Sequence, residues 1–181
     1  MERSTRYTNL SGHAGIAAGL LTLLGSILRH WYHTPFLPTW LGVLFAACVA
    51  NVLFAAGMAR ANGEPLWTRQ AQTVLLSLTP AFVAGLVLTA VLARMGLYLL
   101  LPGVWMLLWG VGALGMSFFT LRIISLLGVA FMVVGTMALF APFSNDALSM
   151  ALSFGAIHLV YGGVLFAARH PIRQSSPVLQ D

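Results

Sequence analysis

The apolar positions of this sequence fall into six long runs, and the polar residues fall almost entirely between them. A helix that crosses the ~30 Å hydrocarbon core of a bilayer needs about 20 apolar residues, which is the approximate length of each run. The pattern therefore predicts an all-α protein with six transmembrane helices over residues 1–168, followed by a flexible cytoplasmic tail over residues 169–181. The predicted spans are Leu10–Leu28, Trp40–Ala59, Thr73–Ala93, Leu97–Phe118, Ile123–Ala141 and Ala147–Ala168.

The breaks between the runs indicate how neighbouring helices are oriented. The joints Arg94–Gly96 and Thr120–Arg122 are three residues long, so the helices on either side of each joint must form antiparallel hairpins. The first run follows Arg3 and Arg6, as the apolar part of a signal peptide would. It is 19 residues long and no small-residue cleavage site follows it, so we interpret Met1–Leu28 as a retained first helix.

The composition supports a membrane protein and excludes several other classes. Hydrophobic residues make up 59% of the 181 residues and charged residues 7%, whereas a soluble domain carries about 25% charged residues. Disorder is excluded because it requires low hydrophobicity. The net charge of +5 comes from scattered arginines with no basic stripe, so no nucleic-acid partner is expected. The single cysteine, Cys48, excludes an internal disulfide.

The distribution of arginine predicts the orientation, because positively charged loops remain in the cytoplasm. If the N-terminus is cytoplasmic, the outer segments contain Arg29 and Arg94, and the other seven arginines lie inside. These are Arg3, Arg6, Arg60, Arg69, Arg122, Arg169 and Arg173. We therefore expect both termini to be cytoplasmic and anionic lipids to gather at the cytoplasmic face.

Glycines recur at a spacing of seven residues in four of the six spans. The pairs are Gly12/Gly19, Gly103/Gly110, Gly128/Gly135 and Gly155/Gly162. Seven residues make two helical turns, so each pair lies on one face and lets another helix approach closely. The stretch from Gly103 to Gly110 also aligns with that from Gly155 to Gly162 in its Gly, Leu and aromatic positions. The pattern predicts three tandem two-helix hairpins in one bundle.

With these glycine pairs and short loops, the helical region resembles the small bacterial six-helix membrane proteins of the HdeD-like acid-resistance group. The resemblance rests on the helix pattern and on the glycine pairs alone. It implies three glycine-bearing hairpins, carries over no catalytic residue, and leads to a group without a settled biochemical activity. Gly15 and Gly19 form a GxxxG pair that would pack a helix of the same chain, or a second copy or another membrane protein.

Several motifs suggest cofactors, and each has a simpler explanation. Gly110, Gly112 and Gly115 match the dinucleotide fingerprint, but that fingerprint requires a preceding strand and here lies inside an apolar span. His30 and His33 could share a cation, yet no acidic residue or cysteine beside them supplies a third ligand. The remaining histidines also fail to predict a haem, because His13 and His158 differ by ~10 Å in depth. We predict no metal and no cofactor.

One group of polar residues is predicted near the middle of the membrane. Asn51 and His158 each lie 11 residues from the outer start of their spans, which places both ~16 Å deep. Thr22 and Thr136 reach nearly the same level from the inner side. Polar side chains at that depth tend to find one another, so the four residues are candidates for a shared pocket. The pocket would be either a hydrogen-bonded staple or a site with His158 as a protonatable gate or ligand group.

The absence of acidic residues from the spans argues against an enzyme or a proton-coupled pump. All four acids, Glu2, Glu64, Asp146 and Asp181, lie in loops or tails. The favoured role is therefore non-enzymatic, either stress-linked or partner-binding, in a bacterial inner membrane. The alternative is a transporter or channel for a small solute, with a polar path at Asn51 and His158. The third reading is a membrane protein that carries haem or another redox cofactor.

Overall fold

The computed structural model describes residues 12–63, 65–118, 122–141 and 145–167, which form six membrane-length helical spans. The predicted all-α fold with six spans is confirmed. The spans are α1 (Gly12–Tyr32), α2 (Phe36–Ala61), α3 (Arg69–Arg94), η1 with α4 (Tyr98–Leu100 and Leu101–Ser117), α5 (Arg122–Phe140), and a sixth that is interrupted. The sixth span consists of α6 (Asp146–Met150), the π-helical segment η2 (Ala151–Gly155) and α7 (Ala156–Ala167). The predicted tail over residues 169–181 lies outside the described residues.

The helix ends follow from local sequence signals. The hydroxyl of Thr68 accepts a hydrogen bond from the backbone N–H of Ala71 at 3.2 Å and so caps the start of α3. Gly63 and Gly96 adopt positive φ angles of 65° and 72° in the turns after α2 and α3, a conformation that glycine adopts without steric cost. After each turn the chain runs back in the opposite direction as the next helix.

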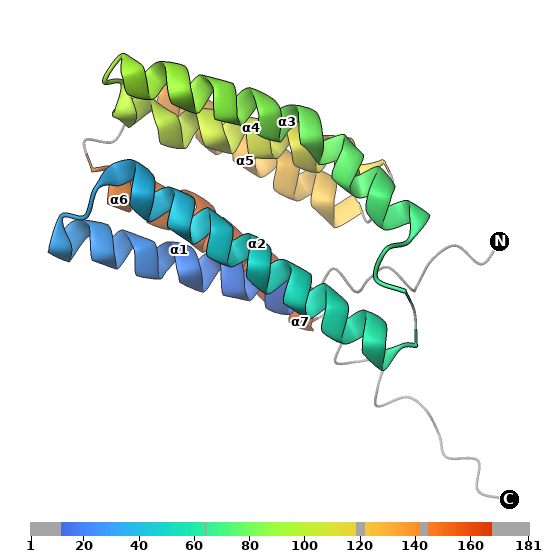
Figure 1. Ribbon diagram of the computed structural model, residues 1–181. Helices are drawn as coiled ribbons and strands as arrows, with labels where there is room; N and C mark the ends of the chain where they lie inside the picture. Colours follow the sequence, from blue (N-terminus) through green and yellow to red (C-terminus); the bar gives the residue numbers. More distant parts are fainter. Residues whose placement is uncertain (1–11, 64, 119–121, 142–144, 168–181) are drawn as a thin grey trace, which may run out of the picture.

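The six spans form two groups of three helices (Figure 1). One group contains α1, α2 and the sixth span, and the other contains α3, α4 and α5. Two pairs that are consecutive in the chain are therefore divided between the groups: α2 with α3, and α5 with the sixth span. The tightest packing joins α4 to α5, the pair that the short Thr120–Arg122 joint predicts to be antiparallel. The next tightest joins α1 to the sixth span, which belongs to a different predicted hairpin.

Glycine pairs form the contact between α1 and the sixth span. A Cβ atom added to Gly12 would lie 2.6 Å from the carbonyl oxygen of Gly162, and one added to Gly162 would lie 2.6 Å from that of Gly12. Two turns away, a Cβ atom on Gly19 would lie 2.9 Å from the carbonyl oxygen of Gly155. The two backbones therefore approach so closely that neither helix has room for a side chain at these positions.

The contact between α4 and α5 repeats this arrangement. A Cβ atom on Gly110 would lie 2.7 Å from the carbonyl oxygen of Gly128, and one on Gly103 would lie 3.1 Å from that of Gly135. The four spans that carry a Gly-x6-Gly pair thus form two equivalent antiparallel seams. A ring of three hairpins would have a third seam of this kind between α2 and α3, the two spans that lack the pair.

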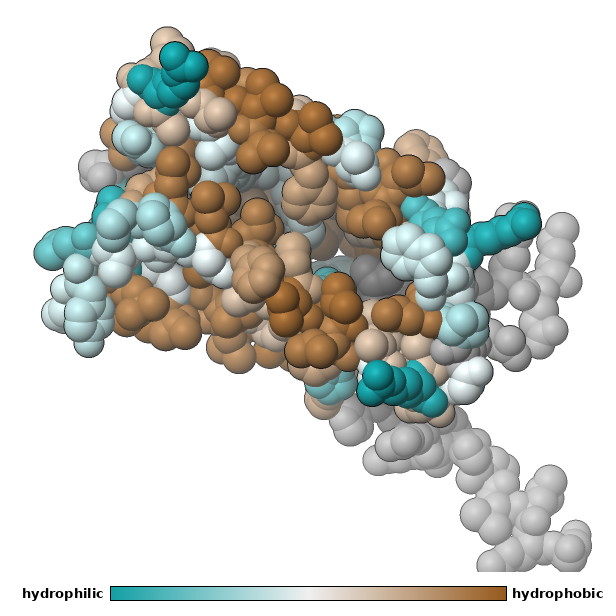
Figure 2. All heavy atoms as spheres, in the orientation of Figure 1, coloured by the Kyte–Doolittle hydropathy of each residue, from teal (hydrophilic) through white to brown (hydrophobic). Residues whose placement is uncertain are grey.

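Apolar clusters fill the interior, and α4 contributes to each of them. The first lies at the end near the α1–α2 turn and joins α2, α4 and α6 through Phe36, Trp40, Leu101 and Met150. The second joins α4 and α5 through Met106, Phe131 and Ala138, with Phe154 and Ile157 of the sixth span packed against it. The third joins the same two helices at the opposite end through Ala113, Met116 and Ile124. Most of the outer surface in Figure 2 is hydrophobic, as a lipid-facing surface must be.

Candidate functional site

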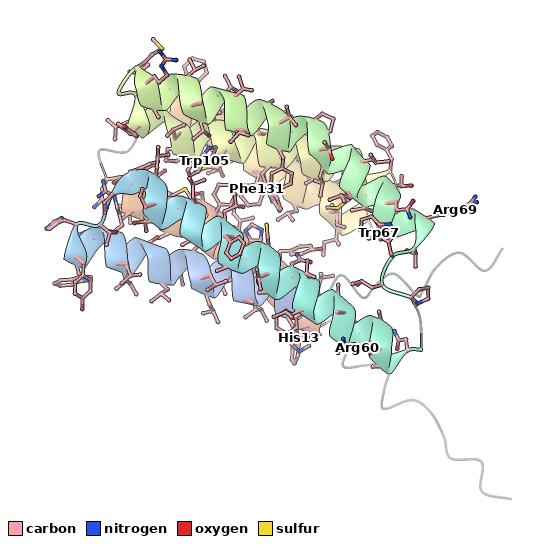
Figure 3. The ribbon with its side chains drawn as sticks, viewed as in Figure 1. His13, Arg60, Trp67, Arg69, Trp105 and Phe131 are labelled. Atoms are coloured by element: carbon pink, nitrogen blue, oxygen red, sulfur yellow. The ribbon has the colours of Figure 1, made fainter. Side chains whose placement is uncertain are left out.

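His158 lies on α7 at the centre of the bundle and is only 8% exposed. Its ring is surrounded by aromatic rings from three spans. The ring centroids of Trp109 on α4, Phe131 on α5 and Phe154 in η2 lie 5.8, 5.3 and 6.0 Å from that of His158. Figure 3 shows Phe131 inside the bundle, between the two groups of helices. The predicted mid-membrane histidine is therefore enclosed by an aromatic cage.

A hydrogen bond to the backbone determines which ring nitrogen of His158 carries the proton. The Nδ1 atom lies 2.8 Å from the carbonyl oxygen of Phe154, and a carbonyl oxygen can only accept. Nδ1–H is thus the donor, and in the neutral imidazole Nε2 has the lone pair. The acceptor Phe154 belongs to the π-helical segment, and such segments often occur at functional sites. Because Nδ1–H is bound to the backbone, the ring atom of His158 that remains for another partner is Nε2, a hydrogen-bond acceptor.

Trp109 supplies the matching donor. Among the residues that the structure describes, no acceptor lies within hydrogen-bonding distance of its buried indole Nε1–H. A buried donor without a partner costs about 1–3 kcal/mol, so such groups are rare and call for an explanation. Phe82 of α3 packs edge-on against the indole with its centroid 6.0 Å away, and this phenyl ring is 41% exposed. Phe82 is thus a partly exposed ring in direct contact with the indole.

Asn51 lies on α2 and is exposed, and its position along the helix can be related to that of Trp40. It follows Trp40 by 11 residues, which is three turns, so both residues lie on one face of α2. Trp40 is 2% exposed, and its Nε1 atom lies 3.5 Å from Oδ2 of Asp146 at the start of α6. His158 follows Asp146 by 12 residues. The π-helical segment contains one residue more than regular α-helical turns would, so His158 also lies about three turns from Asp146.

The structure does not join the four predicted pocket residues by hydrogen bonds. Asn51 is exposed and, within the described part of the chain, makes no hydrogen bond. Thr22 is buried, and its hydroxyl donates to the carbonyl of Ala18 on its own helix at 2.9 Å. Thr136 is exposed, and its hydroxyl donates to the carbonyl of Met132 at 2.8 Å. Both threonines are satisfied locally, so of the four residues only His158 has surroundings that suggest a site, namely the rings of Trp109, Phe131 and Phe154.

An ion pair holds three helices together at the end near the α1–α2 turn. Arg29 Nε donates to Asp146 Oδ2 at 2.9 Å, and Arg29 Nη1 donates to the carbonyl of Thr34. The guanidinium also lies 6.0 Å from the ring centroid of Phe36. Phe36 in turn contacts the rings of Tyr98 and Trp105, with centroids 5.8 Å away in both cases. Polar and aromatic contacts thus close this end of the bundle above His158.

Sequence reasoning singled out His158 but missed the aromatic cage around it and the ion pair, and a site role for the exposed Asn51 stays a prediction. Trp109 could have been found, because it lies 12 residues after Leu97 and so reaches the same depth as His158. Metal binding finds no support in the described ranges, where no group of three His, Cys, Asp or Glu side chains could hold an ion. His30 and His33 are both exposed.

Comparison with protein-family models, with curated proteins and with solved structures finds no match for this chain.

Proposed function

We propose that this chain is a non-enzymatic, multi-pass membrane protein that binds a small neutral solute beside His158 and Trp109. One observation carries the proposal: a buried indole donor without a partner lies against an imidazole whose Nε2 is an acceptor. A hydroxyl group is both donor and acceptor, so it can satisfy both side chains at once. The rest of the solute would contact Phe131 and Phe154, which favours an apolar body. Because the indole N–H is covered, entry requires movement of a ring such as Phe82.

A chemical reaction at this site is not supported by the residues around it. The hydroxyl groups near Pro80 that might act as nucleophiles are engaged by the backbone, since Ser77 donates to the carbonyl of Val74 at 2.7 Å and Thr79 to that of Leu75 at 2.9 Å. Intramembrane hydrolysis needs a nucleophile with a base or a bound metal. Binding, with or without passage of the solute, fits the side chains better than catalysis does.

The indole N–H resonances test the proposal directly. The chain has five tryptophans, so a ¹⁵N-labelled sample gives five indole signals, and Trp109→Phe identifies the one from Trp109. Added 1-hexanol is expected to shift the Trp109 signal downfield, because the N–H gains a hydrogen bond, and to leave the signals of Trp31 and Trp67 unchanged. Hexane, which has no hydroxyl group, is the matched control. Equal shifts with hexane, or equal shifts of all five signals, would refute a site at Trp109.

Substitutions of His158 distinguish a binding site from a structural staple. Leucine removes both ring nitrogens, whereas glutamine keeps a donor and an acceptor. Loss of the bond to Phe154 should cost about 0.5–1.5 kcal/mol of stability with leucine, and less with glutamine. For a binding site, His158→Leu also abolishes the response of Trp109 to 1-hexanol, and His158→Gln retains part of it. A staple would change the melting temperature alone and leave that response intact in both variants.

We further propose that the protein resides in a bacterial inner membrane with both termini in the cytoplasm, as the arginine distribution favours. In a Cys48→Ala background, a cysteine at Met95, which is 65% exposed in the turn after α3, should react with a membrane-impermeant thiol reagent added to intact cells. A cysteine at the exposed Asn62, after α2, should react only after the cells are opened. The reverse pattern would overturn the orientation.

A stress-linked or partner-binding role, as the HdeD-like pattern implies, is compatible with solute binding and would make the solute a signal. Transport is the second candidate, and a specific feature favours it: the buried His158 lies inside a bundle that Arg29, Asp146 and Phe36 close at one end. Flux of small neutral solutes into proteoliposomes would separate transport from binding alone. An absorbance spectrum of the purified protein addresses the haem alternative, which a Soret band would support.

A further inference from the structure

We propose that an anionic phospholipid occupies the space between α2 and α3, with its phosphate at Arg60 and Arg69 and an acyl chain between the two helices. The lipid would take the place of the third glycine seam. The proposal is independent of solute binding at His158, because it concerns the outer edge of the bundle and a different ligand.

The first argument is that the described part of the chain leaves most of the surface of these two helices unburied. None of residues 41–61 of α2 is buried, and among the described side chains of α3 only Thr89 is. Although α2 and α3 are consecutive, they do not pack closely on each other in the described ranges, and Figure 2 shows the surface between them to be hollowed. A depression of about 240 Å³ also opens along α2 against Cys48, Val49, Val52 and Leu53.

The second argument is the chemistry of the exposed face of α2, whose residues alone line the depression. The depression along α2 is lined almost entirely by apolar atoms, which offer water no hydrogen bonds. In a bilayer, an acyl chain is the apolar group available to fill it, and it would do so without leaving a polar group unpaired. The glycine seams exclude lipid because the backbones touch, whereas α2 and α3 leave room for a chain.

The third argument is the charge at one end of this space. Arg60 at the end of α2 and Arg69 at the start of α3 are both exposed, and they flank the loop that joins the two helices (Figure 3). Trp67 lies between them and is 64% exposed, as a tryptophan at a membrane interface typically is. In the described part of the chain neither arginine forms an ion pair; the loop's acid, Glu64, lies outside it. Guanidinium groups bind phosphate through paired N–H donors.

The opposite end of the same space lacks these features. Arg94 is exposed at the end of α3, but α2 begins there with Phe36 and Trp40, which are buried against α4 and α6. A headgroup at that end would meet Arg94 and a closed aromatic cluster, because the nearby Arg29 is paired with Asp146. The two ends therefore predict a single orientation of the lipid, with the phosphate beside the α2–α3 loop.

Native mass spectrometry of the full chain in detergent tests the proposal with two lipids of identical chains, palmitoyl-oleoyl phosphatidylglycerol and the corresponding phosphatidylcholine. We expect one phosphatidylglycerol to be retained per chain, with a preference of at least about tenfold, since each arginine near an anionic group contributes about fivefold. The double variant Arg60→Gln/Arg69→Gln should lose the preference, and Arg94→Gln, on the same helix at the other end, should keep it. Excess inorganic phosphate should not displace the lipid.

A second measurement locates the chain. Phosphatidylglycerol with a photoreactive diazirine in its acyl chain should crosslink to peptides of both α2 and α3, and the double arginine variant should reduce this labelling about tenfold. Equal retention of the two lipids, equal loss in Arg94→Gln, or labelling confined to α1 and α5 would overturn the proposal. So would a lipid-free dimer in which a second copy covers α2. None of these results bears on the Trp109 signal, so solute binding and lipid binding can fail separately.

Discussion

Gly162→Leu is expected to destroy the folded bundle, whereas Gly163→Leu, one residue further along α7, should be tolerated. A Cβ atom on Gly162 would lie 2.6 Å from the carbonyl oxygen of Gly12 and 2.7 Å from the backbone nitrogen of Ile16. Backbone atoms cannot move aside as side chains can, so α1 and the sixth span must separate. Overpacking lowers the stability by about 1–3 kcal/mol where side chains can adjust. Because the backbone cannot adjust in this way, the loss of stability here should reach or exceed the upper end of that range.

Gly163 is the matched control because nothing lies within 4 Å of a Cβ atom built there. Leucine at this position gains about 0.8–1 kcal/mol of helix propensity relative to glycine and projects into lipid. Thermal melting in detergent, followed with gel filtration, should show aggregation or a strongly lowered transition for Gly162→Leu and an unchanged or raised one for Gly163→Leu. Similar melting of the two variants would mean that the seam between α1 and the sixth span does not exist.

The sequence was sufficient to predict the spans and the pairing of α4 with α3 and α5 across three-residue joints, but not the pairing of α1 with the sixth span. Hydropathy gives the six helices because the bilayer requires long apolar runs, and each predicted span overlaps one span of the structure. The glycine spacing also identifies the four helices with close backbone contacts. Any two such helices could pack together, however, so spacing alone could not show that α1 pairs with the sixth span rather than with its hairpin partner α2. That choice depends on contacts between residues far apart in the chain.

The sequence pointed to His158 but not to the side chains that surround it. Counting residues from the ends of the spans places Asn51 and His158 at one level, since helical rise is constant. It cannot show that Thr22 and Thr136 turn their hydroxyl groups back to their own helices, which is an option open to every threonine in a helix. Nor does a count along α4 reveal that the indole N–H of Trp109 lacks a partner. These features depend on the packing of three spans around one ring.

Deleting one residue from the sixth span is expected to be harmless at Leu152 and disruptive at Val160. Both residues are exposed, by 55% and 66%, so neither deletion removes a buried contact. They differ in backbone geometry: Leu152 lies in the π-helical segment η2, and Val160 lies in the regular helix α7. A π-helical segment amounts to one extra residue in an α-helix, so removing one residue from it restores a regular helix.

The two deletions have opposite effects on how the parts of the helix before and after the deleted residue are rotated relative to each other. In a regular helix, nine residues rotate the chain by about 900°, which would place Asp146 and Gly155 on opposite faces. Yet both residues contact α1: Asp146 binds Arg29 of α1, and Gly155 packs on Gly19 of α1. The extra residue in η2 reduces the rotation by about 100°, and a regular helix that lacks Leu152 would keep the same relation. Deletion of Leu152 should therefore leave both contacts and the melting temperature nearly unchanged.

Deletion of Val160 instead rotates Gly162 by about 100° relative to Gly155, because no irregular turn is available to absorb the change. One of the two glycines must then leave the seam with α1, and a side chain takes its place against the backbone of Gly12 or Gly19. We expect loss of the monomeric protein in gel filtration for this variant and retention for the deletion of Leu152. If both deletions were tolerated, the spacing of the glycine pair would carry no packing information; if both failed, the π-helical segment would have a role beyond setting the phase of the helix.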